Sequence, residues 1–147
     1  MTKRKSSTRR LRVVLDTNVY ISALIFSTGS LGAIIEQAKL RTYQPVMSPY
    51  IIAEFTRKLR EKFSVPEARV EDYKRLLVHF SELVVPHDIP MVIPHDPDDN
   101  NILACAETGN ADLIVSGDRD LLDLKEYSGI PIERPKDFVR SLGGLQF

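Results

Sequence analysis

A short apolar run that ends at an acidic residue is the feature that most constrains the fold of this chain. Residues 12–15 read RVVL, and Asp16 follows them directly. A run of apolar, β-favouring side chains of this length predicts a short buried strand with Asp16 at its carboxyl end. In an open α/β sheet, this end of the strands is where ligands bind. The alternative is that Asp16 only caps the helix that begins near Thr17 and Asn18.

Strands and helices alternate along the whole chain. Apolar spacing and Pro or Ser start signals predict helices at residues 31–41, from Pro49, from Pro66 to about Leu83, at 97–108 and from Pro135. Short apolar runs predict strands at residues 44–47, 84–85 and 113–116, and an edge strand at 130–132, where a proline is tolerated. This alternation favours an α/β fold, in which helices cover both faces of a mainly parallel sheet.

Composition limits the class of protein. With 147 residues and 43% hydrophobic side chains, the chain is expected to form one globular domain with a buried core. No apolar run approaches the roughly 20 residues of a membrane span and no signal peptide is recognisable, so we expect no membrane contact and a cytoplasmic location. Cys105 is the only cysteine, and no Cys/His cluster has the spacing of zinc ligands.

Positive charge is concentrated at the N-terminus, although the formal net charge is zero. The first twelve residues hold six of the 20 basic residues and no acid, which leaves 14 basic residues against 20 acidic ones in the rest. We expect residues 1–10 to form a basic, disordered tail that precedes a single domain over residues 11–147. Such a tail either contacts nucleic acid through counterion release or only keeps the protein soluble.

Acidic residues recur at equivalent places, after the four predicted strands. In chain order they are Asp16, Glu54, the pair Asp98 and Asp99, and the pair Asp118 and Asp120. In a parallel sheet these positions lie at one carboxyl edge, where neighbouring carboxylates raise one another's pKa unless a cation neutralises them. Hard oxygen ligands of this kind suit Mg²⁺ or Mn²⁺, which can activate water for phosphoryl chemistry. No His or Lys within these motifs offers an alternative base.

Each acid also has a purely structural interpretation. Asp98 and Asp99 could be acids of a first helical turn, which the helix dipole favours. Asp118 could be a helix cap, and Glu54 could pair with Lys58 one turn further on. The occurrence of all these acids at equivalent positions favours a shared site over several independent structural roles.

Basic residues close to these acids could hold an RNA backbone. Arg57, Lys58 and Arg60 follow Glu54 on the same predicted helix, and Arg119 follows directly after the last acidic strand end. Basic side chains along a groove bind phosphates of single-stranded nucleic acid. The alternative for each of them is a solvated residue on an exposed helix face.

Four segments, taken in order, resemble the PIN domain family. Residues 14–22 read VLDTNVYIS, 48–54 read SPYIIAE, 96–106 read DPDDNNILACA and 111–122 read ADLIVSGDRDLL. The resemblance covers about residues 11 to 140. It is strongest to the group of toxin-component PIN proteins of bacteria and archaea. It implies a three-layer α/β/α, Rossmann-like PIN fold.

What the resemblance implies for function is a metal-dependent ribonuclease that hydrolyses single-stranded RNA as the toxin of a toxin–antitoxin pair. The catalytic, metal-binding positions of the family match Asp16, Glu54, Asp99 and Asp118, with Asp99 preferred to Asp98 because its spacing to Ala106 fits the family. Auxiliary positions match Asn18, Asp96, Asp98, Ser116 and Asp120. The implied cofactor is Mg²⁺ or Mn²⁺, and the implied partners are RNA, an antitoxin protein and a second copy of the chain in a homodimer.

Two other functions stay open. The segment GDRDLLD at residues 117–123 also resembles an acidic motif of haloacid-dehalogenase-type phosphatases. Those enzymes need a second aspartate two residues after the first, and Asn18 occupies that place here. The other alternative is a non-catalytic PIN module that binds RNA or protein, against which the presence of all four acids argues.

Overall fold

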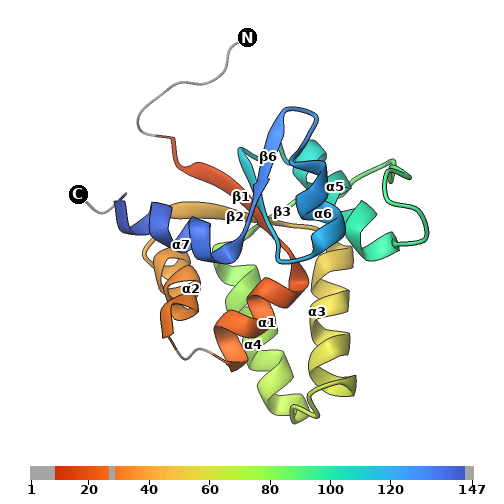
Figure 1. Cartoon of the computed structure of the whole chain (residues 1–147). Coiled ribbons are helices and arrows are strands. Elements are labelled where there is room, and N and C mark those ends of the chain that lie inside the picture. Colours follow the sequence, from red (N-terminus) through yellow and green to blue (C-terminus); the bar gives the residue numbers. More distant parts are fainter. Residues whose placement is uncertain (1–8, 27–28, 145–147) are drawn as a thin grey trace.

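The computed structural model describes residues 9–26 and 29–144, in which six strands form one sheet (Figure 1). The strands are β1 (Leu11–Leu15), β2 (Tyr43–Met47), β3 (Glu82–Leu83), β4 (Leu113–Val115), β5 (Glu126–Tyr127) and β6 (Ile130–Glu133). They lie in the order β3-β2-β1-β4-β6-β5, and every neighbouring pair is parallel except β5 with β6. The predicted α/β class and the mainly parallel sheet are confirmed.

Helices flank this sheet on both sides. They are α1 (Thr17–Ile25), α2 (Gly32–Lys39), α3 (Pro49–Glu61), α4 (Glu67–Phe80), α5 (Pro97–Thr108), α6 (Arg119–Leu124) and α7 (Pro135–Gly144), with a 3₁₀ turn at Gly29–Leu31. In Figure 1, α1 to α4 gather below the sheet, whereas α5 lies above it. α5 packs on β1 and β2. No helix of the described residues is long and apolar enough to cross a membrane.

The two central strands, β1 and β4, end together in the middle of the molecule. The last three residues of β1 are fully buried, because strands of a parallel sheet are covered on both faces and therefore consist of continuous apolar runs. The register pairs Leu15 with Val115, and the N–H of Asp16 donates to the carbonyl of Val115 at 2.9 Å. Asp16 and Ser116, which directly follow the two strands, consequently lie side by side at the carboxyl edge of the sheet.

Two predicted strands lie elsewhere. The third strand, expected at residues 84–85, is β3 at Glu82–Leu83, because α4 ends at Phe80 rather than near Leu83 and the chain becomes extended at Ser81. The strand expected at the sheet edge, residues 130–132, is β6, which lies between β4 and β5. The edge strand β5 has two residues, too few to show a periodic pattern in the sequence.

The end of the predicted basic tail is tied to the sheet. Residues 1–8 lie outside the described residues, whereas Arg9 pairs with Asp112 at 3.0 Å and Arg10 donates to the side chain of Gln44 at 2.7 Å. Arg12 forms a two-pronged ion pair with Glu82 at 2.8 and 3.0 Å. These described arginines therefore have contacts within the protein.

Gly109 provides a test of the packing of α5 on β2. A Cβ atom at this position would lie 2.6 Å from the Cγ1 of Val46 and 3.0 Å from the backbone oxygen of Cys105. We expect Gly109→Ala to lower the free energy of unfolding by about 1–3 kcal/mol, because overpacking forces neighbouring atoms to shift. Chemical denaturation measures this change.

The matched control is Gly143→Ala, since a Cβ at Gly143 in α7 would meet no described atom within 4 Å apart from its chain neighbours and the helix's own backbone. This variant should be neutral or slightly more stable, because alanine is the better helix former. Equal stability of the two variants would contradict the close approach of α5 to β2.

Candidate metal centre

Aspartates cap three helices at the carboxyl edge of the sheet. Asp16 caps α1, Asp96 caps α5 and Asp118 caps α6, each accepting a backbone N–H of the first helical turn, at 3.3, 3.0 and 2.8 Å. The capping interpretation of Asp16 and Asp118 therefore holds, and Asp96 caps its helix in the same way. Each cap uses a single carboxylate oxygen, however, so the second oxygen is available for another contact.

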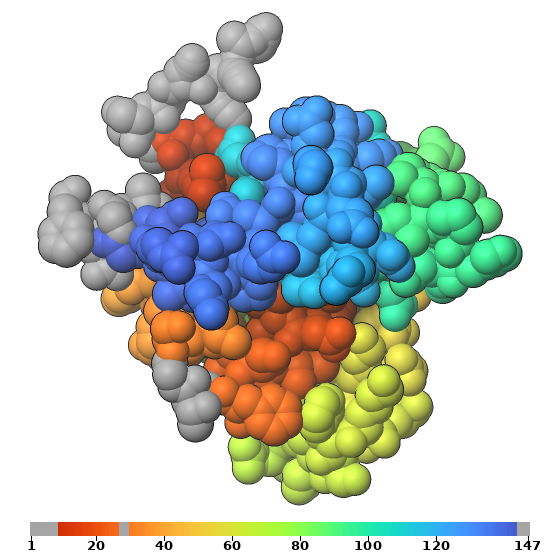
Figure 2. Space-filling view, viewed as in Figure 1, coloured from red at the N-terminus to blue at the C-terminus, as the bar shows by residue number. Residues whose placement is uncertain are grey.

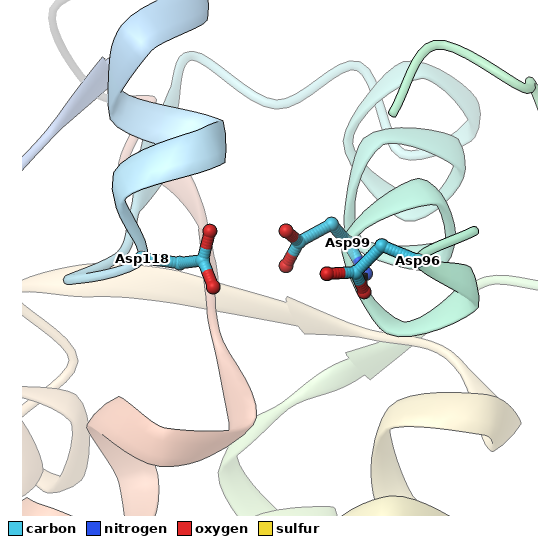
Figure 3. Close-up of side chains that lie close together, drawn as sticks. All are labelled: Asp96, Asp99 and Asp118. Atoms are coloured by element: carbon cyan, nitrogen blue, oxygen red, sulfur yellow. Dashed lines mark hydrogen bonds between the residues drawn. The ribbon is translucent and has the colours of Figure 1, made fainter. Parts of the chain in front are cut away.

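Three carboxylates converge from α5 and α6. Asp96, Asp99 and Asp118 each offer an oxygen, and these three atoms lie within 4.8 Å of one another. Figure 3 shows the side chain of Asp118 facing Asp99 and Asp96 across the space between the two helix starts. Within the described residues, a group of carboxylates able to hold one ion is thus present at the predicted edge.

Asp99 is the most perturbed member of this group. Its side chain is buried, with 4% exposure of the residue, and its Oδ2 has no hydrogen-bond partner. Burial, the side-chain contact with Asp118 and the negative charges of Asp118, Asp96 and Asp16 together raise the pKa of Asp99 to about 8. A buried carboxylate oxygen without a partner costs free energy unless a proton or a cation compensates it.

Ser116 links Asp16 to Asp118. Its hydroxyl donates to Oδ2 of Asp16 at 2.7 Å and accepts the backbone N–H of Asp118 at 2.9 Å. Burial raises the pKa of Asp16, while the hydrogen bonds from Ser116 and the backbone of Asn18, and the charge of Lys58, act in the opposite direction. Asp16 is therefore held in a fixed orientation beside the three converging carboxylates, although it is not one of them.

Glu54 is placed differently from the aspartates. Its carboxylate is held by the guanidinium of Arg57 on the next turn of α3, at 2.8 and 3.3 Å. It lies outside the group of three converging oxygens. The predicted pairing of Glu54 with a basic residue on its own helix is thus real, but the partner is Arg57 at i+3 rather than Lys58 at i+4.

The two adjacent acids at the start of α5 point to different partners. Asp98 accepts the hydroxyl of Tyr50 at 2.5 Å, whereas Asp99 faces Asp118. The next acid along the chain after Asp118, Asp120, is exposed, and only its backbone N–H contacts the Asp118 carboxylate. Of the alternatives left by the sequence, the geometry favours Asp99 over Asp98 as the residue in the centre.

Sequence reasoning did not assign a role to Asn100, which anchors the segment before α5. Figure 2 shows this segment, coloured green, protruding from one side of the molecule, and Met91 within it is 83% exposed. The side chain of Asn100 accepts the N–H of Ile93 at 2.9 Å and donates to its carbonyl at 2.7 Å. This clamp fixes the backbone just before Asp96. In the sequence, the one sign of this role is that Asn100 directly follows the acidic motif.

The donor set fits a hard divalent cation. Carboxylate oxygens that converge without intervening basic side chains are the ligands that Mg²⁺, Mn²⁺ and Ca²⁺ take. The partnerless oxygen of Asp99 and its raised pKa are what such an ion would relieve.

Comparison with known proteins shows the family of this chain. The PIN domain model matches residues 12–120. The chain belongs to the PIN domain family. This family is in general one of nucleases.

Individual relatives extend the match over most of the chain. The uncharacterized protein MJ1680 of Methanocaldococcus jannaschii is 30% identical over 148 positions, which cover 88% of this chain and 90% of that protein. VapBC2 from Rickettsia felis, bound to a DNA fragment from their promoter, is similar in structure at 15% identity, with a TM-score of 0.61 over 84% of this chain and 98% of that one. PAE2754 from Pyrobaculum aerophilum has 13% identity and a TM-score of 0.62 over 95% and 99%. At these identities the two structures support the fold alone.

Asp99 gives a stability prediction for the metal-free protein. Because its pKa in the folded protein lies well above the ordinary value, its contribution to stability is fully present below about pH 4 and is lost as the pH rises through about 8. Asp99→Asn should therefore raise the melting temperature in a chelator by a few degrees at about pH 8.5, and by much less at about pH 5. Thermal denaturation at the two pH values measures the difference.

The control is Asp72→Asn, since Asp72 is exposed on α4 and pairs with Arg75 three residues further on. It should change the melting temperature little at either pH. If Asp99→Asn destabilises the protein equally at both pH values, the carboxylates do not repel one another as described.

Proposed function

We propose that this protein is a Mg²⁺- or Mn²⁺-dependent ribonuclease that hydrolyses phosphodiesters of single-stranded RNA. The observation that carries the proposal is the buried, partnerless oxygen of Asp99 among converging carboxylates in a chain of the PIN domain family. A divalent cation among these carboxylates would compensate this oxygen.

The proposed ligands are Asp16, Glu54, Asp99 and Asp118, with Asp96 as an auxiliary acid. When bound, a divalent ion supplies an acidified water and offsets charge on the phosphoryl oxygens. The chain's own part is to orient the carboxylates. Ser116 holds the carboxylate of Asp16, and Arg57 holds that of Glu54, so neither needs to be ordered when RNA binds.

Basic residues of α3 and α6 are proposed to hold the RNA backbone. Arg57 and Arg60 are already engaged with acids in the described structure, whereas the side chain of Lys58 lies against Asn18. Arg119 is exposed at the start of α6, next to Asp118. Exposed basic groups at the rim of an acidic site are expected to bind phosphates with a strong dependence on salt.

The cellular role in this proposal is that of a toxin that an antitoxin protein inhibits. It rests on the sequence resemblance to toxin-component PIN proteins and on the likeness to VapBC2, which was crystallised on promoter DNA. A homodimer and a cytoplasmic location belong to the same proposal. So does the division into a basic tail at residues 1–10 and one domain at residues 11–147.

Asp16→Asn tests the proposed chemistry. Loss of this carboxylate charge should lower the rate of Mg²⁺- or Mn²⁺-dependent cleavage of a single-stranded RNA by at least about a hundredfold, because charge that stabilises the transition state is lost. The amide can keep the hydrogen bond of Ser116, so the fold should persist. A labelled oligoribonucleotide on a denaturing gel, together with circular dichroism, measures both.

Asp72→Asn should cleave at the parent rate, because Asp72 is remote from the centre on α4. Parent-like cleavage by Asp16→Asn would refute the site. Binding of RNA without cleavage, independent of metal, would identify a non-catalytic module. Release of phosphate from a small phosphomonoester, with RNA left intact, would identify a phosphatase.

A further inference from the structure

Three basic residues lie on the second half of α3, and their partners differ. Arg57 pairs with Glu54 and Glu61, and Arg60 pairs with Glu67 at 2.8 Å. Lys58 instead crosses to α1, where its Nζ donates to Oδ1 of Asn18 at 3.2 Å. Within residues 9–26 and 29–144, this last contact alone links a cation of α3 to the segment that follows β1.

Packing of α3 on α1 directs Lys58 toward the acidic edge. Phe55 and Leu59, which flank it on the helix surface, are fully buried, and the ring of Phe55 meets that of Tyr20 on α1 edge-on at 6.4 Å. Lys58 also lies one turn after Glu54, so both project from a similar side of the helix. The charge of Lys58 reaches the centre, since it lowers the pKa of Asp16 against the effect of burial.

The ammonium of Lys58 retains capacity for a ligand. It has three N–H donors, of which Asn18 accepts one. Among the described residues no carboxylate lies within 4.0 Å of it, in contrast to Arg57 and Arg60. An amide oxygen holds the ammonium in place without neutralising it, which leaves a positioned charge beside the acids.

An anionic substrate needs such a charge. Four carboxylates carry more negative charge than one divalent ion offsets, so an approaching phosphodiester is repelled by the remainder. A positioned ammonium on the rim reduces this repulsion and contacts a phosphate oxygen directly.

We propose that Lys58 binds a backbone phosphate of the RNA at the carboxyl edge, with Asn18 as the acceptor that positions its ammonium. The inference rests on the proposed function for the identity of the substrate. It gives Lys58 the first phosphate contact at this edge, because the guanidinium groups of Arg57 and Arg60 are also engaged in ion pairs within and between α3 and α4.

Equilibrium binding tests the contact independently of cleavage. The full-length Asp16→Asn protein, which is expected to leave RNA intact, is titrated into a fluorescent single-stranded oligoribonucleotide at constant Mg²⁺ over a series of salt concentrations. Adding Lys58→Ala should weaken binding about tenfold, as expected for the loss of one charge-assisted hydrogen bond. The slope of log affinity against log salt should become shallower by about 0.7, the value for one phosphate contact to a single strand.

Lys62→Ala is the matched control, because it removes the same charge from the residue that follows α3 and leaves the contact with Asn18 in place. It should leave the salt slope unchanged, and Lys58→Arg should retain most of the affinity. An identical slope for Lys58→Ala and its parent, or an equal loss for Lys62→Ala, would overturn the proposal. If the otherwise unmodified chain fails to cleave RNA but Lys58→Ala alters the slope as stated, the phosphate contact stands and the proposed catalysis fails.

Discussion

The parallel pairing of β1 with β4 is the constraint on which the rest of the centre depends. It ends both strands at the same level, so that Asp16 and Ser116 emerge side by side and hydrogen bond at 2.7 Å. The same hydroxyl accepts the N–H of Asp118 and thereby fixes the turn that starts α6. One register between two buried strands thus determines the positions of two acids that are about a hundred residues apart in the sequence.

Capping and metal binding use the same aspartates without conflict. A helix start offers unpaired N–H groups that stabilise a carboxylate, and one oxygen is sufficient for that role. Asp96 and Asp118 are tolerated close together because each is partly stabilised by its own helix. Asp99 lies within the first turn of α5 and caps no helix. Its pKa is therefore raised by burial and by the neighbouring acids. An aspartate that caps a helix with one oxygen can therefore also offer its other oxygen to a cation.

The positions of Asp16 and Asp118 could be predicted because they depend on where β1 and β4 end, and these buried strands are visible as apolar runs. Three other features of the site could not be predicted from the sequence. Tyr50 reaches Asp98, Asn100 clamps Ile93, and Lys58 reaches Asn18 across an interface between two helices. Each depends on tertiary packing and not on a local pattern. The sequence did not predict β5 for a different reason, because a strand of two residues is too short to show a pattern.

Glu54 shows that a residue can occupy an acidic motif position without its carboxylate lying among the converging oxygens. Its place in the sequence matches the acidic set, yet Arg57 on the same helix takes its carboxylate. Partly exposed ion pairs between neighbouring turns are weak, whereas a divalent cation attracts several carboxylates at once. Because Arg57 is also paired with Glu61, its guanidinium would keep a partner if Glu54 turned toward an ion. On this argument the Arg57 contact holds Glu54 close to the centre without competing strongly for it.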